Sequence, residues 1–445
     1  MRDEIALAEI TADDLKDSFP FDWERRLRGD DGLELLSHFV GMLDSNAARQ
    51  RSLSVANLAT RDRTVSALLA NLLAGALNRV NPRRFLALSF NRNDYTGTGL
   101  SLSVMVAMRE LLKSERLVHA KVGYFLQHQM EGFNRSSLTR LRPTVALLDL
   151  FAAHAVDRRS VLSPKAQLVR LNLPNDHVGA EGDVITASRA TLARVNALLA
   201  DADMALSDDV WDREAASQPE YADMTRDERR RRQHAGDESA KALYRVFTGN
   251  WRRGGRLYGG WWQSAKKEHR AYITINGLTT VELDYVQLHP ALLRARLPRS
   301  PNIDAYIVPG WPPETRPLGK STFARLLNKA ASKSKPSVSL GRAPTKEKHL
   351  LPAGTDFRDY EAAYRHHMSD YAEWFNIDEG MKLQLEDSDL ALSILNDLAY
   401  HGIAALPVHD SFIVQAQHEE TLRATMRDQF HKSPSGKWLS DISRL

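Results

Sequence analysis

The chain contains no cysteine, and this absence limits the chemistry available to it. Disulfide frameworks, thiolate zinc sites, iron–sulfur clusters and cysteine nucleophiles are all excluded. No segment approaches the roughly 18 uninterrupted apolar residues of a membrane-spanning helix. The N-terminus is charged from its second residue and lacks the apolar centre of a signal peptide. We therefore expect a soluble, cytoplasmic protein with no membrane partner.

Net charge is also small for a chain of this length. The 445 residues include 60 basic and 56 acidic side chains, which gives a formal net charge of +4. This balance permits nucleic acid binding without demonstrating it, because the distribution of charge matters more than the sum. Hydrophobic residues make up 43% of the chain. A full core is therefore expected, and the length suggests about two to four domains.

Two short stretches carry the clearest chemical signal, residues 281–290 and residues 407–414. Each has the apolar and β-branched composition of a strand, and each delivers one aspartate, Asp284 or Asp410. Two carboxylates presented from neighbouring strands form a clamp for two divalent metals, which in-line phosphoryl transfer requires. We predict that Asp284 and Asp410 are the metal ligands and that they hold two Mg²⁺ ions, with Mn²⁺ as the alternative ion.

The residues around both aspartates resemble conserved motifs of family A DNA polymerases. Residues 284–289 read Asp-Tyr-Val-Gln-Leu-His, similar to motif A, and residues 408–412 read Val-His-Asp-Ser-Phe, similar to motif C. The His-Asp-Ser-Phe form also resembles phage-type single-subunit RNA polymerases. Between the two motifs, Arg316 and Lys320 fit the Arg-x-x-x-Lys start of motif B on a fingers helix. The resemblance covers residues 251–420.

The resemblance implies roles for individual residues. Asp284, Asp410 and Lys320 are the expected catalytic residues, with Lys320 beside the triphosphate of the incoming nucleotide. Gln384 resembles the glutamine that faces the minor groove of the primer–template, and His409 is expected near the primer terminus. The residues expected to bind substrate are Arg316, Tyr285, Gln287, His289, Asn328, Gln384 and His409.

The chain departs from the family pattern at the base-stacking and sugar-selecting positions. Asn328 stands where the family usually carries tyrosine, and Ala324 stands where the DNA polymerases carry an aromatic residue. His289 replaces the glutamate that blocks the ribose 2′-hydroxyl. The preference for deoxyribonucleotides or ribonucleotides therefore stays open. No Asp-x-Glu strand typical of a proofreading exonuclease precedes these motifs.

The expected fold is α+β: a right-hand polymerase palm with an antiparallel sheet and reduced fingers, after a mostly helical N-terminal region. An apolar helical pattern covers residues 64–77, and a basic ribbon carries Arg135, Arg140 and Arg142. This arrangement predicts either a winged-helix-like subdomain, with the ribbon on phosphates, or an ordinary α+β subdomain. The four predicted regions are an N-terminal helical region (1–62), the winged-helix-like subdomain (63–165), a basic, thumb-like helical connector (166–250) and the palm and fingers (251–445).

Two further basic segments are candidates for nucleic acid contact. Residues 226–234 concentrate arginine on one predicted helix, which is either a solvated surface or a phosphate-tracking element. Residues 251–262 mix arginine, glycine and aromatic side chains, as nucleic-acid-facing loops often do.

The sequence therefore predicts a template-directed nucleotidyltransferase, a magnesium-dependent DNA-directed DNA polymerase without proofreading. Its expected partners are a DNA primer–template or RNA and nucleoside triphosphates. Its compact size suits DNA replication by a phage, plasmid or other mobile element, or repair. One alternative is a single-subunit RNA polymerase or primase. The other is an inactive nucleic-acid-binding protein on a polymerase scaffold.

Overall fold

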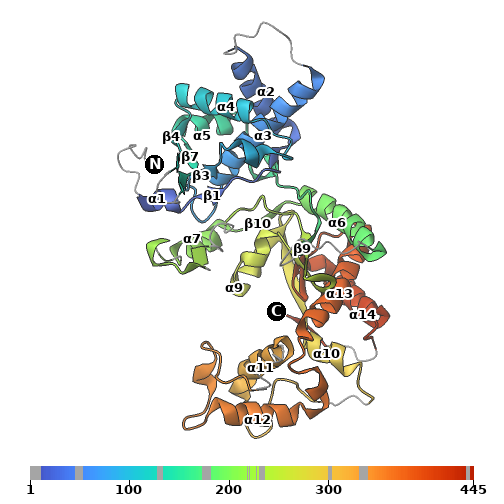
Figure 1. Cartoon of the computed structure of the whole chain (residues 1–445). Coiled ribbons are helices and arrows are strands. Elements are labelled where there is room, and N and C mark those ends of the chain that lie inside the picture. The colour runs from blue at the N-terminus through green and yellow to red at the C-terminus, as the bar shows by residue number, and fades with distance from the viewer. Residues whose placement is uncertain are drawn as a thin grey trace. The chain divides into compact units, whose positions relative to one another are not determined.

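The computed structural model describes residues 12–45, 54–127, 134–172, 182–217, 219, 221–226, 228–229, 236–298, 303–329, 339–436 and 441–445. Helices and strands are mixed along the chain, and most strand pairs are antiparallel (Figure 1). This confirms the expected combination of helices with antiparallel sheets. The chain divides into two compact units, each assembled from three separated segments. Unit 1 comprises Met1–Ala166, Leu199–Ala242 and Gly259–Thr279, and unit 2 comprises Gln167–Leu198, Leu243–Tyr258 and Thr280–Leu445.

Unit 1 is built around the long helix α3 (Val55–Ala76). The helix begins after Ser54, whose hydroxyl accepts a hydrogen bond from the backbone of Asn57 and so satisfies a donor that the first turn leaves open. The apolar pattern predicts a start at residue 64. It misses the first two turns because these are mostly solvent-exposed, and their start is determined by the cap.

Unit 1 contains further helices and strands, several of which pack against α3. The helices are α1 (Ala12–Lys16), α2 (Gly29–Ser45), α4 (Leu102–Ser114), α5 (Val145–Ala153), α7 (Asp208–Ala216) and α9 (Lys267–Arg270). The strands are β1 (Phe19–Pro20), β2 (Arg26–Leu27), β3 (Leu86–Leu88), β4 (Val118–Lys121), β5 (Tyr124–Gln127), β6 (Asn134–Ser137), β7 (Thr139–Pro143), β8 (Val161–Leu162), β10 (Met204–Leu206) and β13 (Ile273–Ile275). One four-stranded sheet has the order β1-β3-β7-β4.

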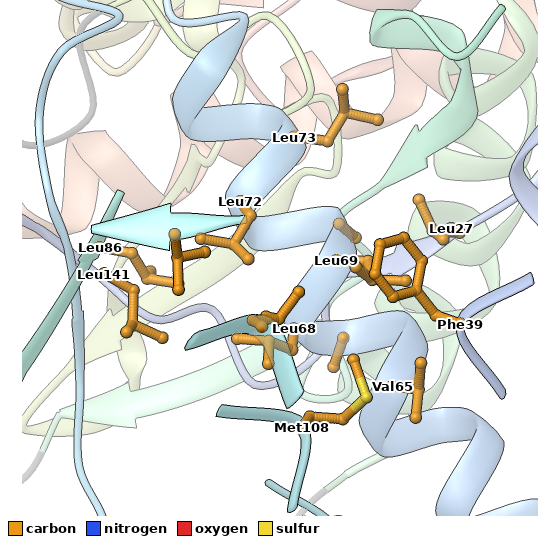
Figure 2. Close-up of a cluster of buried hydrophobic side chains, with 14 of the residues drawn as sticks. Leu27, Phe39, Val65, Leu68, Leu69, Leu72, Leu73, Leu86, Met108 and Leu141 are labelled. Atoms are coloured by element: carbon orange, nitrogen blue, oxygen red, sulfur yellow. The ribbon is translucent and has the colours of Figure 1, made fainter. Parts of the chain in front are cut away.

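The core of unit 1 lies where α3 meets this sheet and its neighbouring helices. Figure 2 shows Leu68 and Leu72 of α3 close to Leu86 of β3 and Leu141 of β7. Phe39 of α2 and Met108 of α4 lie in the same cluster, and all of these side chains are fully buried. Burial of this apolar surface is the main force that holds the unit together.

The basic ribbon of unit 1 makes contacts within the unit. Arg142 is buried, and its guanidinium lies 4.7 Å from the centre of the Phe85 ring. Arg140 donates a hydrogen bond of 3.0 Å to the backbone oxygen of Leu15. These contacts correct the expectation that both arginines touch phosphates. The side chain of Arg135 and most of residues 226–234 lie outside the described residues.

A hairpin leads from unit 1 toward the first aspartate. Ile275 of β13 pairs with Leu278 of β14 (Leu278–Tyr285), so the loop is Asn276–Gly277. Both loop residues have positive φ, 52° and 76°, and Asn-Gly is the preferred sequence for such a two-residue turn. Strands β13 and β14 are therefore joined by a tight hairpin. The boundary of the two units falls within β14, after Thr279.

The buried Lys241 of unit 1 should make the stability of the protein depend on pH. Its ammonium donates a 2.7 Å hydrogen bond to the backbone oxygen of Ala202, and burial lowers its pKa to about 8. Between pH 8 and the unfolded pKa near 10.5, the unfolded chain binds more protons, so stability rises with pH. We expect Lys241→Met to be more stable than wild type below pH 8. This advantage should shrink by roughly 3 kcal/mol by pH 10.5. Urea unfolding of both proteins across this range measures it, and a pH-independent difference would contradict it.

Unit 2 contains both candidate aspartates. Its helices are α6 (Asp183–Asp201, of which the last residues belong to unit 1), α10 (Leu288–Arg294), α11 (Arg316–Asn328), α12 (Phe357–His367), α13 (Gly380–Tyr400) and α14 (Glu419–Lys432). Its strands are β9 (Val169–Asn172), β11 (Tyr244–Thr248), β12 (Asn250–Tyr258), β15 (Leu406–Val408), β16 (Ser411–Gln415) and β17 (Ile442–Arg444), with most of β14. Strands β17-β14-β16-β15 pair antiparallel, and α13 and α14 lie side by side (Figure 1).

Ion pairs attach strands β11 and β12 to α13 and to the turn before it. This arrangement corrects the expectation that residues 251–262 form a nucleic-acid-facing loop. The fully buried Arg245 of β11 donates to the side chains of Ser388 (2.7 Å) and Asp389 (2.5 Å). Gly255 has φ +84°, and a Cβ there would lie 3.0 Å from the Arg245 guanidinium, so glycine leaves room for it. Arg253 pairs with Asp378, and Arg256 pairs with Asp387.

Candidate functional site

The two candidate aspartates lie on neighbouring strands of the unit 2 sheet. Asp284, at the end of β14, is paired in register with Ser411 of β16. Asp410 directly precedes Ser411, in the two-residue loop that joins β15 to β16. Both aspartates are half-buried. The sequence prediction that two strands present these carboxylates side by side agrees with this register.

Residues with positive φ stand beside both aspartates. Gln287 has φ 58°, and this left-handed conformation turns the chain from β14 into α10. Its side-chain oxygen accepts a 2.8 Å hydrogen bond from the backbone of Ala305. The Gln287 side chain therefore holds the segment that leads to α11. His409 has φ 61° in the β15–β16 loop, and its side chain is exposed.

Helix α11 turns residues spaced four apart toward one face, which is more exposed than the rest of the helix. Lys320, Ala324 and Asn328 are exposed and Arg316 is half-buried, whereas the opposite face is buried. Residues four apart share one face of a helix, so the Arg-x-x-x-Lys spacing places both cations together. The positive charge of Lys320 acts on Asp410. The structure therefore brings this helix close to the second aspartate.

Helix α13 adds a third carboxylate. Asp387 is 2% exposed, accepts a 3.2 Å hydrogen bond from Arg256 and lies 3.6 Å from Nε2 of His289. Gln384, one turn earlier, is half-buried. His289 is thus oriented by Asp387, a contact that the sequence did not reveal. The only local signal for Asp387 in the sequence is its position three residues after Gln384.

Asp410 and Asp387 are electrostatically distinct. Burial raises the pKa of Asp410, the negative charge of Asp387 raises it further, and His289 and Lys320 oppose the shift. Burial alone would also raise the pKa of Asp387, but His289 and Arg256 outweigh it and hold this pKa below its usual value. The negative charge of Asp387 is therefore balanced within the protein by His289 and Arg256. Asp410 is the carboxylate that gains from an added cation.

The carboxylates of Asp284 and Asp410 suit a magnesium ion that the protein and the substrate coordinate together. Across the ranges that the structure describes, no group of three or more His, Asp or Glu side chains forms a ready-made metal cage. Mg²⁺ usually keeps several waters and binds through one or two carboxylates together with substrate phosphates. Two aspartates suit that mode of binding. The negative charge of one of them, Asp410, is only partly balanced by His289 and Lys320.

Tyr285 does not belong to the site, which corrects its expected role in substrate binding. It is 2% exposed, and its hydroxyl donates a 2.5 Å hydrogen bond to the backbone oxygen of Met426 in α14. Its ring lies 5.9 Å from that of Phe430. Successive side chains of a strand point to opposite faces, so Tyr285 is turned away from the face that carries Asp284.

The conformation of His409 leads to a testable prediction. A non-glycine residue at positive φ costs about 1–2 kcal/mol, so His409→Gly should raise the free energy of unfolding by about 1 kcal/mol. If the imidazole contacts the substrate, the same change should lower nucleotide incorporation about tenfold. Ala155→Gly is the matched control, because Ala155 has φ 51° in unit 1 and is exposed. It should gain stability without losing incorporation. Equal activity of both variants would remove His409 from the site.

Comparisons with protein-family models, with curated proteins and with solved structures found no match to this chain. The assignment of the site therefore depends on the geometry of unit 2 and on the motif resemblance. Among the described helices, none has both the length and the apolar composition that crossing a bilayer requires.

Proposed function

We propose that this protein is a template-directed nucleotidyltransferase, a magnesium-dependent DNA-directed DNA polymerase whose palm and fingers lie in unit 2. One observation carries the proposal. Asp284 lies at the end of β14 and Asp410 directly precedes its paired strand β16, and the intervening sequence supplies a helix whose Lys320 acts electrostatically on Asp410. Carboxylates for metal and a cation for a triphosphate are the two components that phosphoryl transfer needs.

Each residue of the site has a distinct task in this proposal. Asp284 and Asp410 would hold Mg²⁺, which supplies charge neutralisation at the reacting phosphate. Lys320 binds the triphosphate from the exposed face of α11, with Arg316 one turn before it. Asp387 keeps His289 in place beside the site through their 3.6 Å contact. Gln384 and His409 are proposed to contact the primer–template.

Two other functions stay as alternatives. An RNA polymerase or primase is favoured by His289, which stands at the sugar-selecting position of motif A and faces Asp387. An inactive nucleic-acid-binding protein is favoured by Asn328 and Ala324 on the exposed face of α11, where stacking residues are expected. The unfavourable burial of Asp410 beside Asp387 argues against the inactive protein, because idle repulsion would only destabilise the fold.

Primer extension with separate nucleotide sets distinguishes these functions. A labelled DNA primer on a DNA template is offered dNTPs or NTPs with Mg²⁺, and a parallel reaction omits the primer. Extension with dNTPs from the primer supports the DNA polymerase. Synthesis with NTPs, with or without primer, supports the RNA polymerase or primase. Template binding without incorporation in Mg²⁺ or Mn²⁺ supports the inactive protein. Replication of a mobile element stays a prediction.

A further inference from the structure

We infer that Tyr306 is a nucleotide-binding residue, whose phenolic hydroxyl donates a hydrogen bond to the incoming nucleoside triphosphate. The inference rests on the proposed function, because it concerns the same site. It goes beyond the motif resemblance, since Tyr306 belongs to none of the motifs that carry it. The segment before α11 holds Tyr306 close to the site.

The segment 304–306 is attached at both of its sides. The backbone of Ala305 donates a 2.8 Å hydrogen bond to the side chain of Gln287, three residues after Asp284. Asp304 accepts a 3.2 Å hydrogen bond from Arg316 at the start of α11. Tyr306 therefore lies on a bridge between the strand end that carries the first aspartate and the helix that carries Lys320.

Helices α11 and α12 fix this bridge further. The Tyr364 hydroxyl donates a 2.7 Å hydrogen bond to the backbone oxygen of Ala305, and the Nε2 atom of His367 lies 2.9 Å from the backbone oxygen of Asp304. Gly319 permits a close approach, because a Cβ there would lie 2.0 Å from the backbone oxygen of Tyr306. The segment that carries Tyr306 is thus held by Gln287, by α11 and by α12.

The Tyr306 ring lies among the charged groups of the site. The guanidinium of Arg316 lies 5.2 Å from the ring centre, within the range of a cation–π contact. The negative charges of Asp410 and Asp284 both act on the hydroxyl. The Tyr306 side chain is therefore near a ligand that contacts the two aspartates and Arg316.

The hydroxyl is suited to donate to such a ligand. Tyr306 is 6% exposed, but its hydroxyl is not among the fully enclosed, unpaired polar atoms of the described residues. Its backbone N–H donates a 2.8 Å hydrogen bond to Asp304, which leaves the hydroxyl for a ligand. Burial raises the pKa of the phenol, and the neighbouring Asp410 adds to the shift, so the group stays protonated near neutral pH. A nucleoside triphosphate offers the acceptor oxygens that complete the site.

Single-nucleotide insertion by Tyr306→Phe tests the inference. The phenylalanine ring preserves the contacts with Arg316 and with Phe323, 6.0 Å away, and removes only the hydroxyl. Loss of one hydrogen bond should raise the KM for the template-coded dNTP roughly three- to tenfold, with kcat within about twofold. Tyr360→Phe is the matched control, because Tyr360 is buried in the same unit, next to Trp311. Its KM should equal that of wild type.

The outcomes separate this inference from the proposed function. If wild type inserts the coded nucleotide and Tyr306→Phe has the KM of Tyr360→Phe, the function stands and the role of Tyr306 is wrong. If wild type inserts no nucleotide, the proposed function fails. Equilibrium binding of dATP with Mg²⁺ then decides the inference alone. Weaker binding by Tyr306→Phe than by Tyr360→Phe supports it, and equal binding overturns it.

Discussion

We expect Asp410→Asn to abolish nucleotide incorporation and to stabilise the metal-free protein. Asparagine keeps the shape of the side chain and removes its charge. Loss of several kcal/mol of charge stabilisation at a metal site corresponds to a rate decrease on the order of 10³-fold or more. The ionised Asp410 is disfavoured by burial and by Asp387, as its raised pKa shows. We therefore expect the variant to gain roughly 0.5–2 kcal/mol in its free energy of unfolding at pH 7.

The pH dependence of that gain follows from the direction of the shift. A carboxyl whose folded pKa is raised binds more protons in the folded state, so it destabilises the protein as pH rises. The advantage of Asp410→Asn should be absent below about pH 4 and appear above it. Mg²⁺ with dNTP should raise the melting temperature of wild type and not of the variant. Asp428→Asn, an exposed change of the same charge on α14, should alter neither property. A less stable, still active Asp410→Asn would contradict the account.

Lys320→Met should lower nucleotide incorporation about 10²-fold and leave the fold unchanged. The exposed side chain of Lys320 packs little, so its loss should change the free energy of unfolding by less than about 0.5 kcal/mol. Removal of one group that stabilises transition-state charge typically costs a factor of 10²–10³ in kcat. Lys320→Arg retains the charge and should recover part of the rate.

The matched control for this prediction is an exposed lysine of unit 2 away from the site. Lys432 ends α14, and Lys432→Met removes the same charge from the same unit. Steady-state insertion by the three variants separates the specific role of Lys320 from the effect of net charge on nucleic acid binding. Equal losses in Lys320→Met and Lys432→Met would show that α11 has no special role.

The sequence predicted those parts of the site that depend on local pattern. Strand composition around Asp284 and Asp410, and the four-residue spacing of Arg316 and Lys320, are local signals, and the structure has strands and a helix there. The strand predicted over residues 281–290 is too long, because β14 ends at Tyr285 and α10 begins at Leu288. Tyr285 shows an error that local reasoning could have avoided. Its neighbour Asp284 faces the site, and strand alternation already places Tyr285 on the opposite face.

Other features depend on tertiary contacts that no local pattern encodes. Asp387 approaches His289 only because α13 packs beside α10, and Tyr306 approaches the aspartates only through its bridge to Gln287. The segment that contains β12 has a nucleic-acid-like composition, but the partners of its arginines, Asp378 and Asp387, lie more than 100 residues away in the sequence. The assembly of each unit from three separated segments has the same origin.

Template-coded single-nucleotide insertion is the measurement that tests the central claim most directly. Four DNA templates that differ only at the first unpaired base are each offered the four dNTPs one at a time, with Mg²⁺, using wild type and Asp410→Asn. The account predicts that wild type inserts the complementary nucleotide on each template and that the variant inserts none. Insertion independent of the template base, or insertion that persists in Asp410→Asn, would contradict it.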